Sequence, residues 1–204
     1  MKINKSKFIY LISPNKITTQ FYQDLRKVLK TGKVGIFQMR FKKYSLKKKI
    51  VNGEKIKQIC KKNRVKFLVN DDPVLAKKLN ADGCHLGQKD IDIIEARKII
   101  GNKIIGITCH NSIKFAKTAI KNKVDYLAFG AFFSTKTKKA KHKATTKILN
   151  KAKKLTKTPL VAIGGINSSN YKKLLLNNAN FLAISSYIWN NKKNKPLEAI
   201  KKLK

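Results

Sequence analysis

Two aspartates that could bind a metal ion follow two predicted strands in the first half of the chain. Asp71 comes directly after the apolar residues 65–69 and Asn70, and Asp90 closes the segment D-G-C-H-L-G-Q-K-D, which contains a short predicted strand at residues 84–85. In a barrel of alternating strands and helices, residues just past the carboxyl ends of the strands project into one shared mouth. Two carboxylates that converge there suit a hard cation that bridges to a phosphorylated substrate. The spacing therefore predicts a Mg2+–diphosphate site.

The same aspartates have an alternative interpretation as helix caps. Asp71 could be the N-cap of a helix that begins near Pro73. Asp90 could cap a helix that runs through Ile94 and Ile99, since Asp is favoured at N-caps. For either residue alone, a cap is the more common role. The pair would nevertheless lie at two strand ends on one face of the expected fold, and this shared position favours metal binding.

A second set of candidate residues follows the second predicted strand, in the segment Q-M-R-F-K at residues 38–42. Strand alternation directs Gln38, Arg40 and Lys42 to one side, which would be the mouth of the barrel. Arg offers a planar fork and Lys a point charge, and both match the oxygens of a diphosphate. In a chain this basic most Arg and Lys side chains are solvated charges, but the shared side of this pair favours substrate binding.

Two further segments have the chemistry of phosphate sites. After the sixth predicted strand, residues 134–138 read S-T-K-T-K, and their hydroxyl and ammonium groups could bind a phosphate from one loop. The alternative is a flexible polar loop, since residues 134–146 are highly basic and lack apolar periodicity. After the seventh strand, Gly164 and Gly165 allow a close backbone approach, and the N–H groups of the following helix can receive a phosphate.

Apolar runs of strand length recur along the chain with helical patterns between them, which is typical of parallel strand–helix units. Strands are expected at residues 8–12, 34–38, 65–69, 84–85, 103–108, 125–129, 160–163 and 181–184. Helices are expected at residues 18–30, 45–62, 91–100, 112–121, 145–156, 168–177 and 196–203, and a short one from about residue 73. Eight strands and eight helices predict an α/β fold, a single-domain TIM (β/α)8 barrel that spans residues 1–204.

A doubly wound open sheet would use the same strand–helix units. The barrel is favoured because small residues follow the last two expected strands, Gly164-Gly165 after the seventh and Ser185-Ser186 after the eighth. The loops after these two strands are where TIM barrels commonly bind phosphate.

The composition raises a separate question about partners. The 204 residues include 48 Lys and Arg against 10 Asp and Glu, a formal net charge of +38, which is typical of proteins that bind nucleic acid or anionic membranes. The lysines are spread over nearly every helical segment, however, without an aromatic stacking stripe or an RNA-binding signature. We therefore expect solvated faces, with no specific nucleic acid and no membrane as partner. Nucleic-acid binding is kept as a distant alternative.

The cysteines and the opening segment bear on location. Cys60, Cys84 and Cys109 are odd in number and widely spaced, which argues against a disulfide framework or a metal knuckle. The opening segment has an apolar run of only five residues before Ser13-Pro14, too short for the core of a signal peptide, and nothing approaches a membrane span. The sequence predicts a cytoplasmic protein.

The chain resembles the thiamine phosphate synthase family in six segments. In order, they are Q-M-R-F-K, V-N-D-D, D-G-C-H-L-G-Q-K-D, I-I-G-I-T-C-H-N, D-Y-L-A-F-G-A-F-F-S-T-K-T-K and V-A-I-G-G-I-N, and they run from Gln38 to Asn167. The family is a TIM barrel that condenses 4-amino-2-methyl-5-(diphosphooxymethyl)pyrimidine with 4-methyl-5-(2-phosphoethyl)thiazole to give thiamine phosphate and diphosphate. The resemblance implies a transferase of thiamine biosynthesis whose partners are these small phosphorylated substrates.

The resemblance also implies roles for individual residues. Asp71 and Asp90 would bind Mg2+, whereas Arg40, Lys42 and Lys138 would neutralise the leaving diphosphate. The residues implied in substrate binding are Gln38, Met39, Arg40, Phe41, Lys42, Asn70, Thr108, Thr135, Lys136, Thr137, Lys138, Gly165, Ser185 and Ser186.

Three positions depart from the family pattern. Thr108 stands where the family usually has Ser and keeps the hydroxyl that would face the pyrimidine diphosphate. Ala131 replaces the common Pro, and Ser185 replaces an aliphatic residue. None of the three removes a charged participant, but the last two leave open whether the thiazole specificity is altered.

His85 and His110 stand at expected strand ends, where a His usually packs or forms hydrogen bonds. His110 nevertheless lies where a sister family, thiazole tautomerase, has a catalytic His. A tautomerase would act on the thiazole phosphate alone and need no Mg2+. The complete set of Arg, Lys, two Asp and T-x-T-K favours the synthase over this alternative. The sequence leaves the oligomeric state and the role of His110 open.

Overall fold

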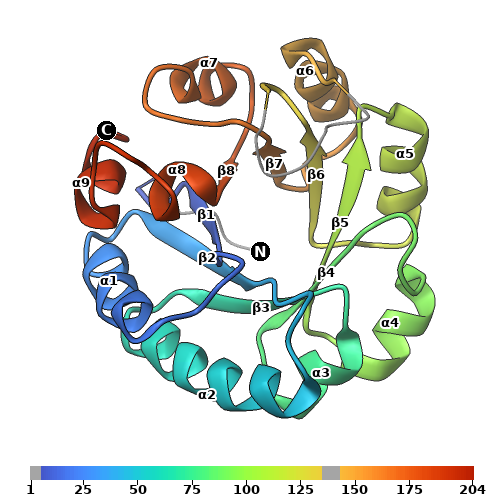
Figure 1. Ribbon diagram of the computed structural model, residues 1–204. Coiled ribbons are helices and arrows are strands. Elements are labelled where there is room, and N and C mark those ends of the chain that lie inside the picture. Colours follow the sequence, from blue (N-terminus) through green and yellow to red (C-terminus); the bar gives the residue numbers. More distant parts are fainter. Residues whose placement is uncertain (1–5, 135–142) are drawn as a thin grey trace.

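Eight strands lie parallel and pair in chain order, and the eighth pairs with the first to close a barrel (Figure 1). The computed structural model describes residues 6–134 and 143–204. The strands are β1 (Ile9–Ile12), β2 (Val34–Met39), β3 (Lys66–Asn70), β4 (Gly83–Leu86), β5 (Ile104–His110), β6 (Tyr126–Gly130), β7 (Leu160–Ile163) and β8 (Phe181–Ile184). The helices are α1 (Thr19–Leu29), α2 (Leu46–Lys62), α3 (Pro73–Lys78), α4 (Ile93–Ile100), α5 (Ile113–Lys121), α6 (Thr146–Leu155), α7 (Tyr171–Leu176), α8 (Ser186–Trp189) and α9 (Pro196–Lys201).

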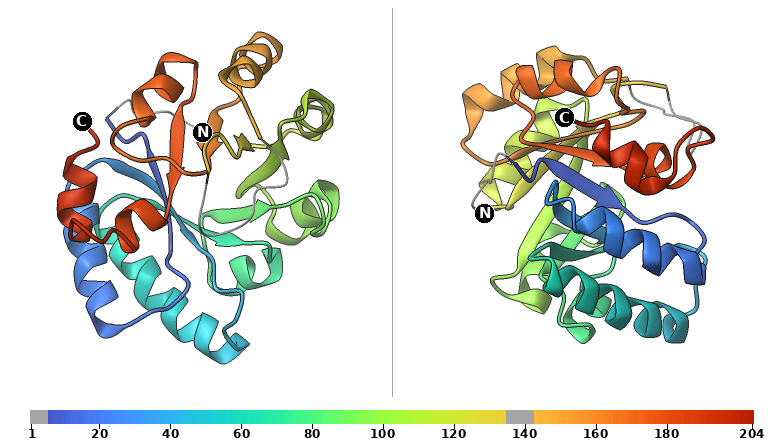
Figure 2. Two further views of the ribbon diagram at one scale, coloured as in Figure 1. Left: turned by 45° about the horizontal axis from the view of Figure 1, so that its top comes forward. Right: turned by 90° about the vertical axis from the view of Figure 1, so that its left-hand side faces the viewer.

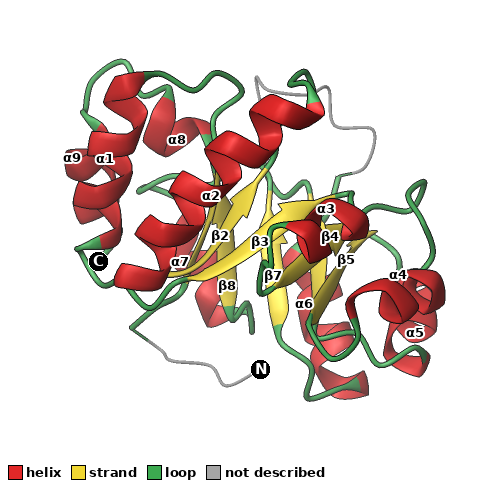
Figure 3. Ribbon diagram, turned by 90° about the horizontal axis from the view of Figure 1, so that it is seen from below, coloured by secondary structure: helices red, strands yellow, loops and turns green. Residues whose placement is uncertain are grey.

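The helices surround the strands (Figure 3). The last helix, α9, packs beside the first, α1, and so completes the ring (Figure 2). The predicted TIM (β/α)8 barrel is therefore confirmed. In the described part of the chain, no helix combines the length and the apolarity needed to cross a membrane. The three cysteines, Cys60, Cys84 and Cys109, are buried and free.

Several element boundaries differ from the prediction, most of them by one or two residues. The short helix α8 begins at Ser186, where only a turn was expected, because a single helical turn is too short to show apolar periodicity. Helix α7 begins at Tyr171 instead of residue 168, since Asn167 accepts hydrogen bonds from the amide and hydroxyl of Ser169 and holds this segment in a turn. Strand β5 continues to His110, two residues beyond its predicted end.

The helix caps overturn the alternative interpretation of the two aspartates. The N-cap of α3 is Asp72, whose carboxylate accepts from a first-turn N–H at 2.8 Å. The N-cap of α4 is Asp92, whose carboxylate accepts likewise at 2.9 Å. Asp71 and Asp90 therefore cap neither helix, and the alternative interpretation of these two residues as caps is wrong. Each stands in the loop between a strand and the residue that caps the next helix.

Strand alternation builds two apolar layers. Outward side chains such as Phe37, Met39 and Val69 join the large core between the strands and the helices. Inward side chains form a smaller core inside the barrel, which consists of Tyr10, Ile12, Ile36, Leu68, Tyr126, Ala128, Val161, Phe181 and Ala183. The next inward residue along several strands is polar, and this places polar side chains between the inner core and the mouth.

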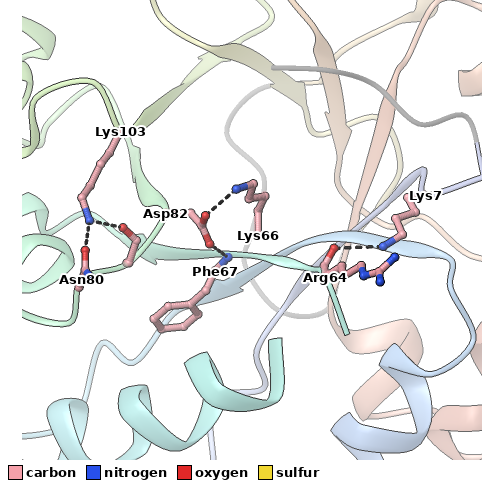
Figure 4. Close-up of polar contacts among 8 residues, drawn as sticks. Lys7, Arg64, Lys66, Phe67, Asn80, Asp82 and Lys103 are labelled. Atoms are coloured by element: carbon pink, nitrogen blue, oxygen red, sulfur yellow. Dashed lines mark hydrogen bonds and ion pairs between the residues drawn. The ribbon is translucent and has the colours of Figure 1, made fainter. Parts of the chain in front are cut away.

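Polar contacts tie the loops to the strands at the amino end of the barrel (Figure 4). Asp82, which precedes β4, accepts from Lys66 Nζ at 2.7 Å and from the Phe67 amide at 2.9 Å. Lys7 Nζ donates to the Arg64 carbonyl at 3.0 Å. The contacts of Asp82 connect the chain before β4 to its neighbour β3, and the contact of Lys7 joins the segments that precede β1 and β3. The residues with predicted chemistry lie in or after the carboxyl-terminal halves of the strands, toward the opposite end of the barrel, as is usual for this fold.

Candidate active site

Asp71 and Asp90 follow the carboxyl ends of β3 and β4, two strands that pair with each other. Asp71 has a left-handed backbone with φ of 65°, and its amide donates to the His85 carbonyl at 2.8 Å. The carboxylate of Asp90 accepts from the Gly87 amide at 2.7 Å. The Asp71 carboxylate lies close enough to influence the ionisation of the Asp90 carboxyl.

The surroundings of Asp90 disfavour its negative charge. Burial raises the pKa of its carboxyl, the N–H of Gly87 lowers it, and the neighbouring Asp71 carboxyl raises it again. The net shift is upward. Lys42 offsets part of this repulsion, since its Nζ lies 3.1 Å from Asp71 Oδ2. A pair of carboxylates held this close gains from any further cation placed between them.

The other acidic side chains have local structural contacts. All ten acidic residues of the chain lie in the part that the structure describes. Eight of them cap helices, bind strand amides or pair along one helix: Asp24, Glu54, Asp72, Asp82, Asp92, Glu95, Asp125 and Glu198. The remaining two, Asp71 and Asp90, are the pair that meets at the mouth of the barrel.

This pair fits Mg2+ when the metal arrives with a phosphorylated ligand. Mg2+ prefers oxygen ligands and is usually held by one or two carboxylates together with waters and substrate phosphates. Among residues 6–134 and 143–204, no group of three or more His, Cys, Asp or Glu side chains could hold a metal ion. The described residues therefore suit a site whose remaining ligands come from the substrate, and not a cage made by protein alone.

A pocket of about 440 Å³ is lined by Asp71 and lies between the ends of β2 and β3 and the helices α2 and α3. Its polar wall consists of Lys42, Lys49, Asn70, Asp71 and Asp72, and its apolar wall includes Met39, Phe41, Val74 and Ile91. The structure thus brings together several residues that the resemblance implies in substrate binding. Met39 and Phe41 are 2% and 4% exposed, so a ligand could touch only the small part of them that faces this pocket.

Gln38 lies deeper than the sequence predicted. Alternation does direct it inward, but its side chain is only 3% exposed, and its Nε2 donates to the Tyr10 hydroxyl at 3.0 Å. Arg40, the next inward residue, is half-buried, and its backbone amide donates to Ser13 Oγ at 2.9 Å. The expectation that Gln38 stands in the open mouth beside Arg40 and Lys42 is therefore wrong, because β2 carries it one layer below.

Gln38 is one end of a chain of hydrogen bonds, the interior network, which consists of Gln38, Tyr10, Tyr126, His85 and Thr108. The hydroxyls of Tyr10 and Tyr126 lie 2.8 Å apart. The Tyr126 hydroxyl lies 2.8 Å from His85 Nδ1, and His85 Nε2 lies 2.8 Å from Thr108 Oγ1. The network joins five strands across the barrel. Its two ends, Gln38 and Thr108, are both residues that the resemblance implies in substrate binding.

Burial keeps the interior network uncharged. Burial lowers the pKa of His85 from 6.5 to about 4, with a smaller upward effect of Asp90 and a downward effect of Arg40. Burial also raises the pKa of both Tyr10 and Tyr126. Near neutral pH the two phenols keep their protons and the imidazole carries one. The effects of Asp90 and Arg40 on His85 indicate that the charged mouth lies directly beside the network.

The ends of β6 and β7 approach each other closely on another side of the mouth. Gly165 has a left-handed φ of 63°, and a Cβ added to it would lie 2.4 Å from the Ser134 carbonyl oxygen and 2.8 Å from Phe133 Cβ. No larger residue fits here without a shift of the backbone. At the end of β8, Ser185 Oγ donates to the Ser13 carbonyl at 3.2 Å, and Ser186 begins α8. Thr135, Lys136, Thr137 and Lys138 lie outside the described residues.

The expectation that a strand-end His forms hydrogen bonds is confirmed for His85, whose two ring nitrogens both contact hydroxyls. His110 ends β5 with a left-handed φ of 52°, and its ring centroid lies 6.3 Å from that of Phe115. Tyr10 and Tyr126 were not among the residues predicted from the sequence. Their signal was available, since a Tyr at an inward strand position must find a partner for its hydroxyl.

Comparison with known proteins bears on the identity of the chain. Residues 9–188 match the family model described as "Thiamine monophosphate synthase". A thiamine-phosphate synthase from Pelagibacter ubique is 67% identical over 204 residues, which cover 100% of this chain and 98% of that protein. The chain belongs to the thiamine monophosphate synthase family. A second thiamine-phosphate synthase, from Erythrobacter litoralis, is 39% identical over 196 residues, and the match covers 94% of this chain and 92% of that protein.

Solved structures agree with this family membership. A thiamine phosphate pyrophosphorylase from Pyrococcus furiosus superimposes with a TM-score of 0.85 at 28% sequence identity, over 98% of this chain and 95% of that one. An orotidine 5'-phosphate decarboxylase from Pyrococcus horikoshii superimposes with a TM-score of 0.67 at 12% identity. The second likeness shows the barrel alone.

Proposed function

We propose that this member of the family is a thiamine-phosphate synthase that joins the pyrimidine, with loss of its diphosphate, to the ring nitrogen of the thiazole phosphate. The observation that carries the proposal is the 67% identity to a thiamine-phosphate synthase over the whole chain. The two aspartates at the mouth support it, because a diphosphate leaving group needs concentrated positive charge around it. Arg40, Lys42 and an ion held by Asp71 and Asp90 would supply that charge.

In the proposed reaction, negative charge grows on the diphosphate as its bond to the methylene carbon breaks. Arg40 and Lys42 stand at the end of β2, where preorganised cations can stabilise that developing charge. Lys138 would add a third, as the resemblance implies. Mg2+ bound by Asp71 and Asp90 would neutralise further charge on the phosphate oxygens. The aminopyrimidine donates electrons to the methylene cation, and the thiazole nitrogen captures it, so positioning replaces a protein nucleophile.

The thiazole phosphate would bind on the side of β6 to β8. Gly165, Ser185 and Ser186 follow β7 and β8, where TIM barrels commonly bind phosphate. Thr135 and Thr137 would complete this site according to the resemblance. The cytoplasmic location and the extent of one domain over residues 1–204 remain predictions from the sequence.

The direct test is an assay with both substrates and Mg2+ that measures thiamine phosphate and released diphosphate. We expect both products in equal amounts, and we expect EDTA to abolish them. Formation of product in fully chelated protein would remove the Mg2+ assignment. Failure to form thiamine phosphate with Mg2+ present would overturn the proposed function.

A second assay separates the synthase from the tautomerase alternative. Lys138→Ala should lower the synthase rate by about a hundred- to a thousand-fold, as is common when one stabilising group is removed from developing charge. His110→Ala should have a much smaller effect with both substrates present. If Lys138→Ala is silent while His110→Ala eliminates conversion of an unaromatised thiazole phosphate given alone, the protein is a tautomerase.

A further inference from the structure

The interior network contains three residues that the proposed mechanism does not use. Tyr10 and Tyr126 are 1% and 0% exposed, and neither belongs to the set implied in substrate binding. The ring of Tyr126 needs room that only a glycine provides, because a Cβ added to Gly106 would lie 1.8 Å from Tyr126 Cζ. Glycine in a strand weakens it, so β5 gives up side-chain packing to admit this ring beside His85.

The number of donor hydrogens limits how donors and acceptors can be ordered along the network. Tyr10, Tyr126 and Thr108 each carry one hydroxyl hydrogen, and a neutral imidazole carries one N–H. In the described residues no hydrogen bond or ion pair joins the His85 ring to a carboxylate, and both ring nitrogens meet hydroxyl oxygens. Four hydrogens therefore serve three contacts. One hydrogen is left over, and it belongs to the hydroxyl of either Tyr10 or Thr108, which can donate it to a group outside these three contacts.

Gln38 determines which of these two hydroxyls keeps a hydrogen for donation. Its Nε2 donates to the Tyr10 oxygen at 3.0 Å, so the hydroxyl hydrogen of Tyr10 turns to Tyr126. Tyr126 in turn donates to His85 Nδ1. The imidazole proton then lies on Nε2 and is donated to Thr108 Oγ1. The hydrogen left over is that of the Thr108 hydroxyl.

Thr108 is tied to the turn that carries Asp90, on the side of the mouth where a ligand can meet its hydroxyl. Its backbone carbonyl accepts from Gln88 Nε2 at 2.6 Å, and Gln88 lies within the Gly87–Asp90 turn. We propose that the interior network is directed from Gln38 to Thr108 and makes the Thr108 hydroxyl a hydrogen-bond donor to the pyrimidine diphosphate. Tyr10, Tyr126 and His85 are then positioning residues. The direction is a property of the free protein, whereas the identity of the ligand rests on the proposed function.

The direction can be measured without substrate. In protein labelled with 15N at histidine, the imidazole shifts at neutral pH identify which nitrogen carries the proton, and His85→Gln assigns the signal. We expect the Nε2–H form. Tyr126→Phe removes the donor to Nδ1 and should mix the two tautomers. Tyr171→Phe is the matched control, since this buried tyrosine donates its hydroxyl to the Lys204 carbonyl in the outer core, and it should leave the signal unchanged.

Gln38→Glu is the sharper variant, because it replaces the donor at the start of the network with an acceptor. Tyr10 must then donate to the new carboxylate, and the donor and acceptor of every hydrogen bond in the network exchange. We expect His85 to switch to the Nδ1–H form although residue 38 does not contact it. If this variant does not fold, the wild-type tautomer and Tyr126→Phe still decide. An Nδ1–H form in the wild-type protein would overturn the proposed direction.

The ligand contact is tested by kinetics. Thr108→Val keeps the shape and removes the donor, so the KM for the pyrimidine diphosphate should rise roughly five- to ten-fold, with kcat less affected. Thr108→Ser keeps the donor and should behave like the wild type. An unchanged KM in an active Thr108→Val enzyme would overturn the donor role alone. A wild type that makes no thiamine phosphate would overturn the proposed function and leave the tautomer result standing.

Discussion

The Lys42 ammonium lies 3.1 Å from the Asp71 carboxylate at the mouth of the barrel. A side chain expected to bind diphosphate therefore neutralises an expected metal ligand in the free protein. Binding of Mg2+ with the diphosphate would free Lys42 to turn from the carboxylate to a phosphate oxygen. The ion pair thus couples the two parts of the proposed site.

Lys42→Met tests this coupling. Since exposed ion pairs are worth up to about 1 kcal/mol, removal of the competing ammonium should tighten binding of Mg2+ alone to the free protein by up to about five-fold. The same variant should slow diphosphate release with both substrates. Calorimetry with Mg2+ measures the first effect and the coupling assay the second. Lys43→Met, an equal change of charge at the exposed neighbour, is the control, and weaker Mg2+ binding in Lys42→Met would contradict the competition.

Asp90→Asn should separate stability from activity. Because the folded protein raises the pKa of Asp90, its ionised form is disfavoured on folding, and stability from this group is lost as pH rises through that pKa. The neutral amide should therefore raise the melting temperature at pH 7 in the absence of metal. Activity should fall at least about a hundred-fold, since even partners of metal ligands are worth 10- to 100-fold.

The matched control for Asp90→Asn is Asp92→Asn. This residue carries the same charge two positions away, but it caps α4, and Asn is as good an N-cap as Asp. We expect neither its melting temperature nor its activity to change much. Equal loss of activity in both variants would show that the effect comes from the net charge and not from the site.

The barrel was predictable from the sequence because every strand–helix unit repeats the same alternation of apolar runs. The mouth was predictable for a related reason, since the residues that follow a strand, such as Asp71 after β3, are known once the strand is known. The depth at which each side chain lies along the barrel was not predictable. Gln38 and Arg40 share one side of β2, but only the structure shows that the first lies inside the barrel and the second at its rim.

The helix caps show a second limit of the sequence. Asp71 and Asp72 are adjacent, and Asp90 and Asp92 are two positions apart. The pattern alone allowed either member of each pair to cap the next helix. The backbone decides, because Asp71 takes a left-handed φ of 65° and leaves the extended N-cap conformation to Asp72. The interior network was out of reach for another reason, since its contacts join residues from five strands whose register a single sequence does not give.

The stability of the protein should depend on His85 in weakly acidic solution. Burial lowers the pKa of His85 from 6.5 to about 4, so between these values the unfolded chain binds a proton that the folded protein does not. Stability from this group is complete above pH 6.5 and is lost as pH falls toward 4, by up to roughly 3 kcal/mol. Urea unfolding at several pH values should show this loss in the wild type and a shallower one in His85→Gln. Parallel curves would contradict a buried neutral imidazole.

Gly165→Ala tests the side of the mouth assigned to the thiazole phosphate. An added Cβ would lie 2.4 Å from the Ser134 carbonyl oxygen and 2.8 Å from Phe133 Cβ, so the chain after β6 must move away from the chain after β7. We expect the KM for the thiazole phosphate to rise about ten-fold or more, as for a displaced group that holds the substrate. The KM for the pyrimidine diphosphate should change much less, because Lys42, Asp71 and Asp90 follow other strands, β2, β3 and β4.

Gly32→Ala provides the control for backbone strain. Gly32 has a left-handed φ of 72°, close to the 63° of Gly165, but an added Cβ would meet nothing within 4 Å. Both variants should therefore lose about 1 to 2 kcal/mol of stability from the conformation itself, and urea unfolding measures this part. The effect on KM should appear in Gly165→Ala alone, since only there do two loops of the mouth touch. If the two variants bind the thiazole phosphate equally well, the close approach of Gly165 to Ser134 serves packing, and the phosphate site must lie elsewhere on the rim.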